Sequence, residues 1–253
     1  MSIISTTKFL FLNSIKDKLL IIFIVFSFLI GCFAIFFGNL AIVEQSFAIN
    51  SFLATALRLS ILSSLCLYIC FSIKQLRDGK ILQIFIANGL SRNNLIIAAF
   101  LNYLIISLIF CLLAFIILCS INFSITINSV IWTLSLFCEA LILSGFSLAV
   151  ITIFNSPVIS FLCVVLFYIF SRIVGFMLFM LKSPNNISDF NSALSGGYEI
   201  LAFIVPRLDF FAKSEWLIYG FNTQEIWLVI IQTIIYVPLI LLVSLYDFSK
   251  KEL

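Results

Sequence analysis

The sequence predicts an all-α, polytopic membrane protein that forms a single domain over residues 1–253 and has six transmembrane helices. Hydrophobic residues make up 63% of the 253 residues and charged residues only 10%, and the mean hydropathy is +1.26. No soluble domain can bury this much apolar side chain, whereas a bilayer solvates it. The apolar residues also form runs that are long enough, at the 1.5 Å rise of a helix, to cross a bilayer.

Six apolar runs separated by polar connections define the predicted spans. They cover about residues 19–37, 52–73, 94–119, 130–153, 158–181 and 225–246. Residues 1–18, which precede the first span, are predicted to be a short polar start. Pro157 suits the first turn of the fifth span, where no amide hydrogen is needed. Asn222 and Glu225 are expected to form a capping box at the start of the sixth span.

Lys and Arg are distributed unequally between the two predicted sides of the membrane. One side has Lys8, Lys16, Lys18, Lys74, Arg77, Lys80, Arg92, Lys250 and Lys251. The other side has only Lys182, Arg207 and Lys213, all in the connection between the fifth and sixth spans. Because Lys and Arg are retained in the cytoplasm, both termini are predicted to be cytoplasmic. A bacterial inner membrane is the default location, and an organelle membrane is the alternative.

Several classes of function are excluded by residues that the sequence lacks. There is no His, which removes the commonest metal and haem ligand. A Gly-rich phosphate loop, paired catalytic carboxylates and metal-ligand spacings are also absent. The seven Cys lie in apolar runs and are expected to be structural. We therefore expect no intrinsic enzyme activity and no cofactor bound by this chain, and the net charge of +3 is too small to indicate nucleic acid.

Three charged residues fall inside the predicted spans, where each is costly unless it is paired or faces water. Counted from the outer ends of the spans, Arg58 lies roughly 9 Å deep, and Glu139 and Arg172 lie roughly 13 Å deep, by the helical rise. This similar depth predicts that Glu139 pairs with Arg58 or with Arg172. Such a cluster either locks the bundle together or forms a polar wall for an amphiphilic or anionic cargo.

The most basic connection between spans runs from Lys74 to Asn94 and reads KQLRDGKILQIFIANGLSRNN. Its apolar residues form a broad face, which predicts a short amphipathic helix at the membrane surface. Asn88-Gly89 favours the end of this helix, and Ser91 is expected to cap the next span. The helix either lies on lipid or docks against a soluble partner.

The connection from residue 182 to residue 225 is the longest in the chain. It begins polar and then becomes apolar in YEILAFIV, which is too short to span a bilayer. Pro206 separates this piece from a second amphipathic piece, Leu208 to Tyr219. Two short helices that lie at the membrane face are therefore predicted.

In this order of elements, the chain resembles ABC-2 type transporter permeases. The basic connection, from Arg77-Asp78-Gly79-Lys80-Ile81-Leu82 to Ser91-Arg92, looks like the segment that forms the cytoplasmic coupling helix of this family. Val205-Pro206-Arg207-Leu208-Asp209 resembles the family's extracytoplasmic re-entrant helices between spans five and six. The ending, Tyr246 to Leu253, is similar to the end of many members.

The resemblance implies the membrane-spanning permease subunit of an ABC exporter, which moves a hydrophobic or amphiphilic cargo with ATP hydrolysed by a separate ATP-binding subunit. It also implies a second permease subunit, alike or unlike, and contact with membrane lipids. Residues expected to form or flank the contact with the ATP-binding subunit are Arg77, Asp78, Gly79, Lys80, Ile81, Leu82, Ser91 and Arg92. Alternatives are the permease of a haem or cytochrome c maturation exporter, a non-transporting assembly or structural factor, and a secondary transporter.

Overall fold

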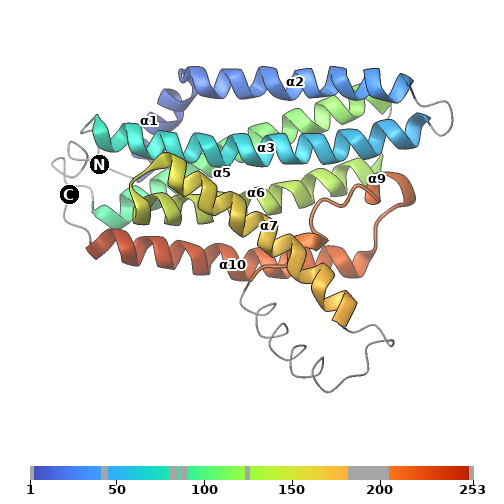
Figure 1. Cartoon of the computed structure of the whole chain (residues 1–253). Coiled ribbons are helices and arrows are strands. Elements are labelled where there is room, and N and C mark those ends of the chain that lie inside the picture. Colours follow the sequence, from blue (N-terminus) through green and yellow to red (C-terminus); the bar gives the residue numbers. More distant parts are fainter. Residues whose placement is uncertain are drawn as a thin grey trace.

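The structure, a computed structural model, describes residues 3–40, 45–79, 85, 91–122, 126–181 and 205–250. Within these residues the chain is helical, without strands, and its neighbouring long helices alternate in direction (Figure 1). The six long helices are α2 (Lys18–Asn39), α3 (Gln45–Asp78), α5 (Arg92–Asn122), α6 (Ile127–Phe154), α7 (Pro157–Leu181) and α10 (Thr223–Lys250). The shorter elements are α1 (Ile3–Ile15), the 3-10 helix η1 (Leu208–Phe210) and α9 (Trp216–Tyr219).

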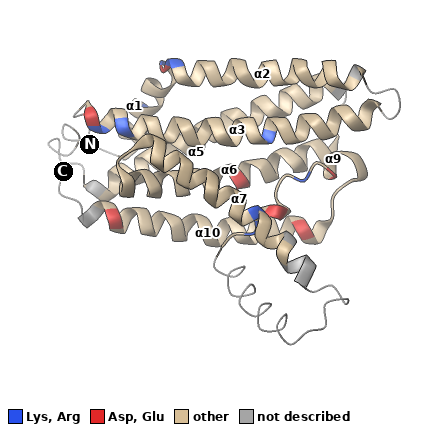
Figure 2. Cartoon of the chain, viewed as in Figure 1, with Lys and Arg blue, Asp and Glu red and all other residues tan. Residues whose placement is uncertain are grey.

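The start of α1 and the end of α10 lie at the same end of the bundle, which is called the terminal end below (Figure 1). The opposite end, where α9 lies, is called the far end. Figure 2 shows charged residues gathered at the terminal end and around α7, α9 and the start of α10. The length of α2 between its two ends is free of charged residues in the same view.

All six long helices are long and apolar enough to cross a membrane, as predicted. Their bounds extend past the predicted spans at most ends. The largest extension is in α3, which begins at Gln45 and ends at Asp78. The apolar run in the sequence marks only the part of a helix that hydrocarbon can surround. Polar residues at the ends continue the same helix beyond that part.

Helices α3 and α6 form the centre of the bundle. The most apolar stretches of α6 and α3 are 72% and 67% buried, whereas those of α10, α2 and α7 are only 17–28% buried. Hydroxyl groups in the centre are satisfied within their own helices, as Ser64 donates to Ile61 O at 3.0 Å and Ser147 to Leu143 O at 2.7 Å. Such bonds let small polar residues pack inside the bundle. The outer helices present large apolar side chains outward.

Residues 1–18 are not the polar start that the sequence predicts, because Ile3–Ile15 form the helix α1. This helix packs against α5. Ser14 Oγ accepts a hydrogen bond of 3.1 Å from Asn102 Nδ2, and Leu10 is buried. Asp17 then caps α2 by accepting from Leu19 N at 3.2 Å.

The second predicted amphipathic piece, Leu208 to Tyr219, is not one continuous helix. It consists of η1 and the single turn α9, joined by residues in extended and left-handed conformations. Its buried side chains, Leu208, Phe211, Ala212 and Trp216, face the bundle, and it contacts α3, α6 and α7. The first predicted piece, YEILAFIV at residues 198–205, lies outside the described residues except for Val205.

Candidate functional site

The three charged residues predicted to lie inside spans come from three different helices. Arg58 is on α3, Glu139 is on α6 and Arg172 is on α7. Arg172 Nη2 lies 3.6 Å from Glu139 Oε1, so Glu139 is paired with one of its two candidate partners. The Glu139 side chain is fully buried, and neither of its oxygens makes a hydrogen bond to a described residue.

Arg58 differs from Arg172 because none of the ion pairs in the described part of the chain includes it. The residue is 8% exposed, and its Nη1 donates a hydrogen bond of 3.0 Å to the Ala212 carbonyl. Arg172 Nη2 donates to the neighbouring Phe211 carbonyl, also at 3.0 Å. Two guanidinium groups and one carboxylate therefore meet in a buried place, which leaves one positive charge without a counter-charge there.

The backbone of Ala212 is held from two sides. Its carbonyl accepts from Arg58 on α3, and its amide donates to Ser135 Oγ on α6 at 3.0 Å. Ala212 has a φ of 42°, a left-handed conformation that is uncommon for a residue other than glycine. We refer to the contacts of Arg58, Ser135 and Arg172 with Phe211 and Ala212 as the clasp. The clasp fixes the 205–222 segment to α3, α6 and α7.

The sequence did not identify Ser135, Phe211 or Ala212 as site residues. Two of them contribute only backbone groups, which every residue has, so no pattern of side chains marks them. Ser135 is one of many Ser residues in the spans. Only the pair of buried arginines indicated that polar partners were needed nearby.

A second set of polar contacts joins the 205–222 segment to the start of α10. Glu225 Oε1 accepts from Lys213 Nζ at 2.8 Å, and Glu225 Oε2 accepts from Trp216 Nε1 at 3.0 Å. The predicted capping box is therefore only half correct. Asn222 Oδ1 caps α10 by accepting from Gln224 N at 3.1 Å, whereas the Glu225 carboxylate is engaged by the segment instead.

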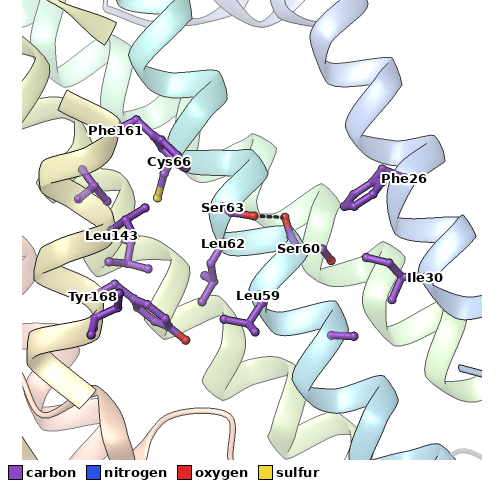
Figure 3. Close-up of a pocket in the computed structure, with 14 residues that line it drawn as sticks. Phe26, Ile30, Leu59, Ser60, Leu62, Ser63, Cys66, Leu143, Phe161 and Tyr168 are labelled. Atoms are coloured by element: carbon purple, nitrogen blue, oxygen red, sulfur yellow. Dashed lines mark hydrogen bonds between the residues drawn. The ribbon is translucent and has the colours of Figure 1, made fainter. Parts of the chain in front are cut away.

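Two cavities lie beside the clasp. A polar cavity of about 380 Å³ is lined by Thr55, Arg58, Arg172, Asp209, Lys213, Ser214 and Glu215. An apolar cavity of about 450 Å³ lies between α2, α3, α6 and α7. Figure 3 shows its lining, with Phe26 and Ile30 of α2 on one side and Leu143 and Tyr168 on the other.

The predicted contact with a partner subunit lies at the terminal end and is described only in part. Arg77 and Asp78 belong to the last turn of α3 and Gly79 follows it, so they are not part of a separate short helix. The predicted helix and Lys80, Ile81 and Leu82 lie outside the described residues, apart from the buried Phe85, whose ring meets Phe9 of α1 edge-on at 5.5 Å.

The other end of this connection matches its prediction. Ser91 Oγ accepts a hydrogen bond of 3.4 Å from Asn94 N, so Ser91 caps α5, which begins at Arg92. At the α3 end, Arg77 Nη1 donates to Asn155 Oδ1. Asn155 has a φ of 57° and forms the turn between α6 and α7. The end of α3, where the connection begins, is thereby attached to the α6–α7 turn.

Among the described residues, no group of three or more His, Cys, Asp or Glu side chains could hold a metal ion. Six apolar helices of sufficient length around a small buried charge cluster indicate an integral, multi-pass membrane protein. No family model matches the chain, and a comparison with curated proteins finds no matching relative.

Proposed function

We propose that the chain is the membrane-spanning permease subunit of an ABC-type exporter. In this role it moves a hydrophobic or amphiphilic cargo with ATP hydrolysed by a separate subunit, and two such halves form the membrane part. The observation that supports the proposal most is the contact of Arg77 with Asn155. It attaches the end of α3, where the basic connection that resembles a coupling helix begins, to the turn between two of the long helices.

Helix α3 connects the Arg77–Asn155 contact at the terminal end with the clasp. With 34 residues, α3 is about 50 Å long at the rise of an α-helix. It has Arg77 at the terminal end and Arg58, which takes part in the clasp, towards the far end. The helix α7 begins beside Asn155 and carries Arg172, the second arginine of the clasp. A push on the connection would thus move α3 and α7 together and shift the 205–222 segment.

The subunit contact is tested by purifying the intact chain from its native membranes in a mild detergent. A subunit that is labelled by a photoreactive ATP analogue should co-purify with it. Reversing the charges of Arg77 and Lys80 to Glu should remove that subunit. The matched control reverses Lys16 and Lys18 to Glu, which lie at the same end of the bundle but outside the predicted contact, and should retain it.

The main alternative is a non-transporting assembly or structural factor, and the clasp itself favours it. Hydrogen bonds from three helices to one segment can serve only to lock the bundle together. In that case, the membrane complex would be stable and would contain no subunit that binds ATP. The same purification therefore separates the two functions.

A further inference from the structure

The polar and apolar cavities are both lined by residues of α3 and α7. On α3, Arg58 lines the polar cavity, and the adjacent Leu59 lines the apolar one. On α7, Tyr168 lines the apolar cavity, and Arg172, one turn further on, lines the polar one. The guanidinium carbon of Arg172 lies 5.6 Å from the centre of the Tyr168 ring. Lining residues of the two cavities are therefore adjacent on α3 and one helical turn apart on α7.

The inner wall of the polar cavity carries an excess of positive charge. Arg172 is paired with Glu139, whereas Arg58 has no ion pair among the described residues. The Nε atoms of both arginines are buried and donate to no described residue. An unpaired charge held among apolar helices is costly unless it meets water or a partner of opposite sign. These groups are thus suited to an anion.

Other charges around this cavity do not cancel that excess. Lys213 is paired with Glu225 at 2.8 Å, and Asp209 is paired with Arg207 at 2.9 Å. Glu215 is exposed at the surface, where water and salt screen its charge. Screening is much weaker at Arg58, which is only 8% exposed. The buried guanidinium of Arg58 therefore determines which ligand charge the inner part of the cavity attracts.

The apolar cavity has the size and chemistry of a hydrocarbon site. Its two serines, Ser60 and Ser63, donate to Leu57 O and Ser60 O of their own helix, so they present little unsatisfied polarity (Figure 3). The remaining lining is almost entirely aliphatic and aromatic. A cavity of about 150 Å³ is known to hold a benzene molecule. By that scale, 450 Å³ accommodates a chain on the order of 15 carbon atoms.

We propose that the two cavities together bind one anionic amphiphile with a phosphate headgroup. Its phosphate lies between Arg58 and Arg172, where charge-assisted hydrogen bonds to guanidinium nitrogens are available. Its hydrocarbon chain lies in the apolar cavity between α2, α3, α6 and α7. Binding of such an amphiphile does not depend on an ATPase. That the amphiphile is also the transported cargo rests on the proposed function, and it narrows the cargo to anionic amphiphiles.

Native mass spectrometry of the purified full chain in a non-ionic detergent tests the proposal. The probes are phosphatidylglycerol, phosphatidylcholine with the same chains, dodecyl phosphate and inorganic phosphate. We expect phosphatidylglycerol and dodecyl phosphate to bind, phosphatidylcholine to bind at least about tenfold more weakly, and inorganic phosphate not to bind. Equal affinity for the two phospholipids, or binding of inorganic phosphate alone, would overturn the proposal.

Variants assign the binding to these cavities. Arg58→Gln should weaken phosphatidylglycerol binding about tenfold or more, the equivalent of one charged hydrogen bond. Arg77→Gln, at the terminal end of α3 and in the lining of neither cavity, should leave it unchanged. If Arg58→Gln does not fold, Thr55→Glu serves instead, because it places a negative charge in the cavity without touching the clasp. An equal loss in Arg77→Gln and in Arg58→Gln or Thr55→Glu would contradict the assignment.

The position of the ligand's hydrocarbon chain is tested by filling the apolar cavity with a larger side chain. Ala56→Phe should abolish binding of phosphatidylglycerol and dodecyl phosphate, whereas Cys32→Phe, on the exposed face of α2, should not. If Ala56→Phe instead separates a dimer without changing lipid binding, the cavity is a contact with a second copy and the proposal is wrong. Lipid binding is measured on the purified protein without any partner subunit. A failure to bind lipid can therefore be distinguished from a failure to co-purify with an ATP-binding subunit.

Discussion

Arg58 and Ala212 are 154 residues apart in the chain, and the Arg58 guanidinium donates a hydrogen bond of 3.0 Å to the Ala212 carbonyl. With Arg172 on the Phe211 carbonyl and Ser135 on the Ala212 amide, three side chains satisfy consecutive buried backbone groups. Unsatisfied backbone groups cost several kcal/mol where water is excluded. The clasp therefore allows an irregular segment to lie buried between helices.

The pairing of Arg172 with Glu139 should appear as a coupling energy in thermal stability. Arg172→Gln leaves a fully buried carboxylate without its nearest counter-charge, which costs about 3–5 kcal/mol. Adding Glu139→Gln removes that stranded charge, so the double variant should be more stable than Arg172→Gln alone. The expected coupling is about 1–3 kcal/mol, measured by unfolding of the detergent-solubilised protein.

A second set of single and double variants, with Arg58 in place of Arg172, serves as the comparison. Since Arg58 forms no ion pair with a described carboxylate, Arg58→Gln and Glu139→Gln should couple more weakly. Equal coupling of the two arginines to Glu139 would mean that the carboxylate does not distinguish between them.

Gly175 should not tolerate a methyl group. A Cβ at Gly175 of α7 would collide with the carboxylate of Asp209, which is itself held by Arg207. Gly175→Ala is therefore expected to lower stability by about 1–2 kcal/mol, the usual range for overpacking less the gain in helix propensity. Apparent melting temperatures measure the effect.

Gly145 of α6 is the matched control for this substitution. A Cβ there would lie 3.5 Å from Ile240 Cγ2, which is an ordinary contact. Gly145→Ala should thus be neutral or stabilising by up to about 1 kcal/mol, because Ala favours the helix. A loss of stability at Gly145 as large as that at Gly175 would argue against the contact between α7 and Asp209.

Replacement of Ala212 by glycine should not destabilise the protein. Its φ of 42° costs an alanine about 1–2 kcal/mol, and glycine adopts this conformation freely. Some of that gain is lost to the greater freedom of glycine in the unfolded chain. Ala212→Gly should therefore be neutral or stabilising by about 1 kcal/mol. Ala140→Gly, in the buried centre of α6, should instead cost about 1 kcal/mol, and equal losses at both positions would refute the strained conformation.

The sequence was sufficient to predict the six spans, because a bilayer requires long apolar runs and tolerates few exceptions. It was not sufficient to predict α1. The buried face of that helix consists of Thr6, Thr7, Leu10 and Ser14. Three of these four residues are polar, so the face has no hydrophobic pattern, and only packing against α5 makes it stable as a helix.

The charge cluster was predictable for a related reason. Charges are rare inside spans, so similar depth on three spans was enough to relate Glu139 to Arg58 or Arg172, but not to choose between the two arginines. The clasp was not predictable, because its acceptors are the carbonyls of Phe211 and Ala212. Glu225 was misassigned to a capping box because local spacing gives no information about Lys213 and Trp216, which approach it from an adjoining segment.

The orientation in the membrane can be measured with a maleimide that does not cross the bilayer. Ser91, at the start of α5, is exposed at the terminal end, and Tyr219, at the end of α9, is 78% exposed at the far end. Since Lys and Arg gather at the terminal end, Ser91→Cys should react only from the cytoplasmic side and Tyr219→Cys only from the outside. The unmodified chain, whose Cys lie in the spans, gives the background. A Ser91→Cys variant that reacts from outside would remove the surface on which a cytoplasmic ATPase must dock, and the proposed function with it.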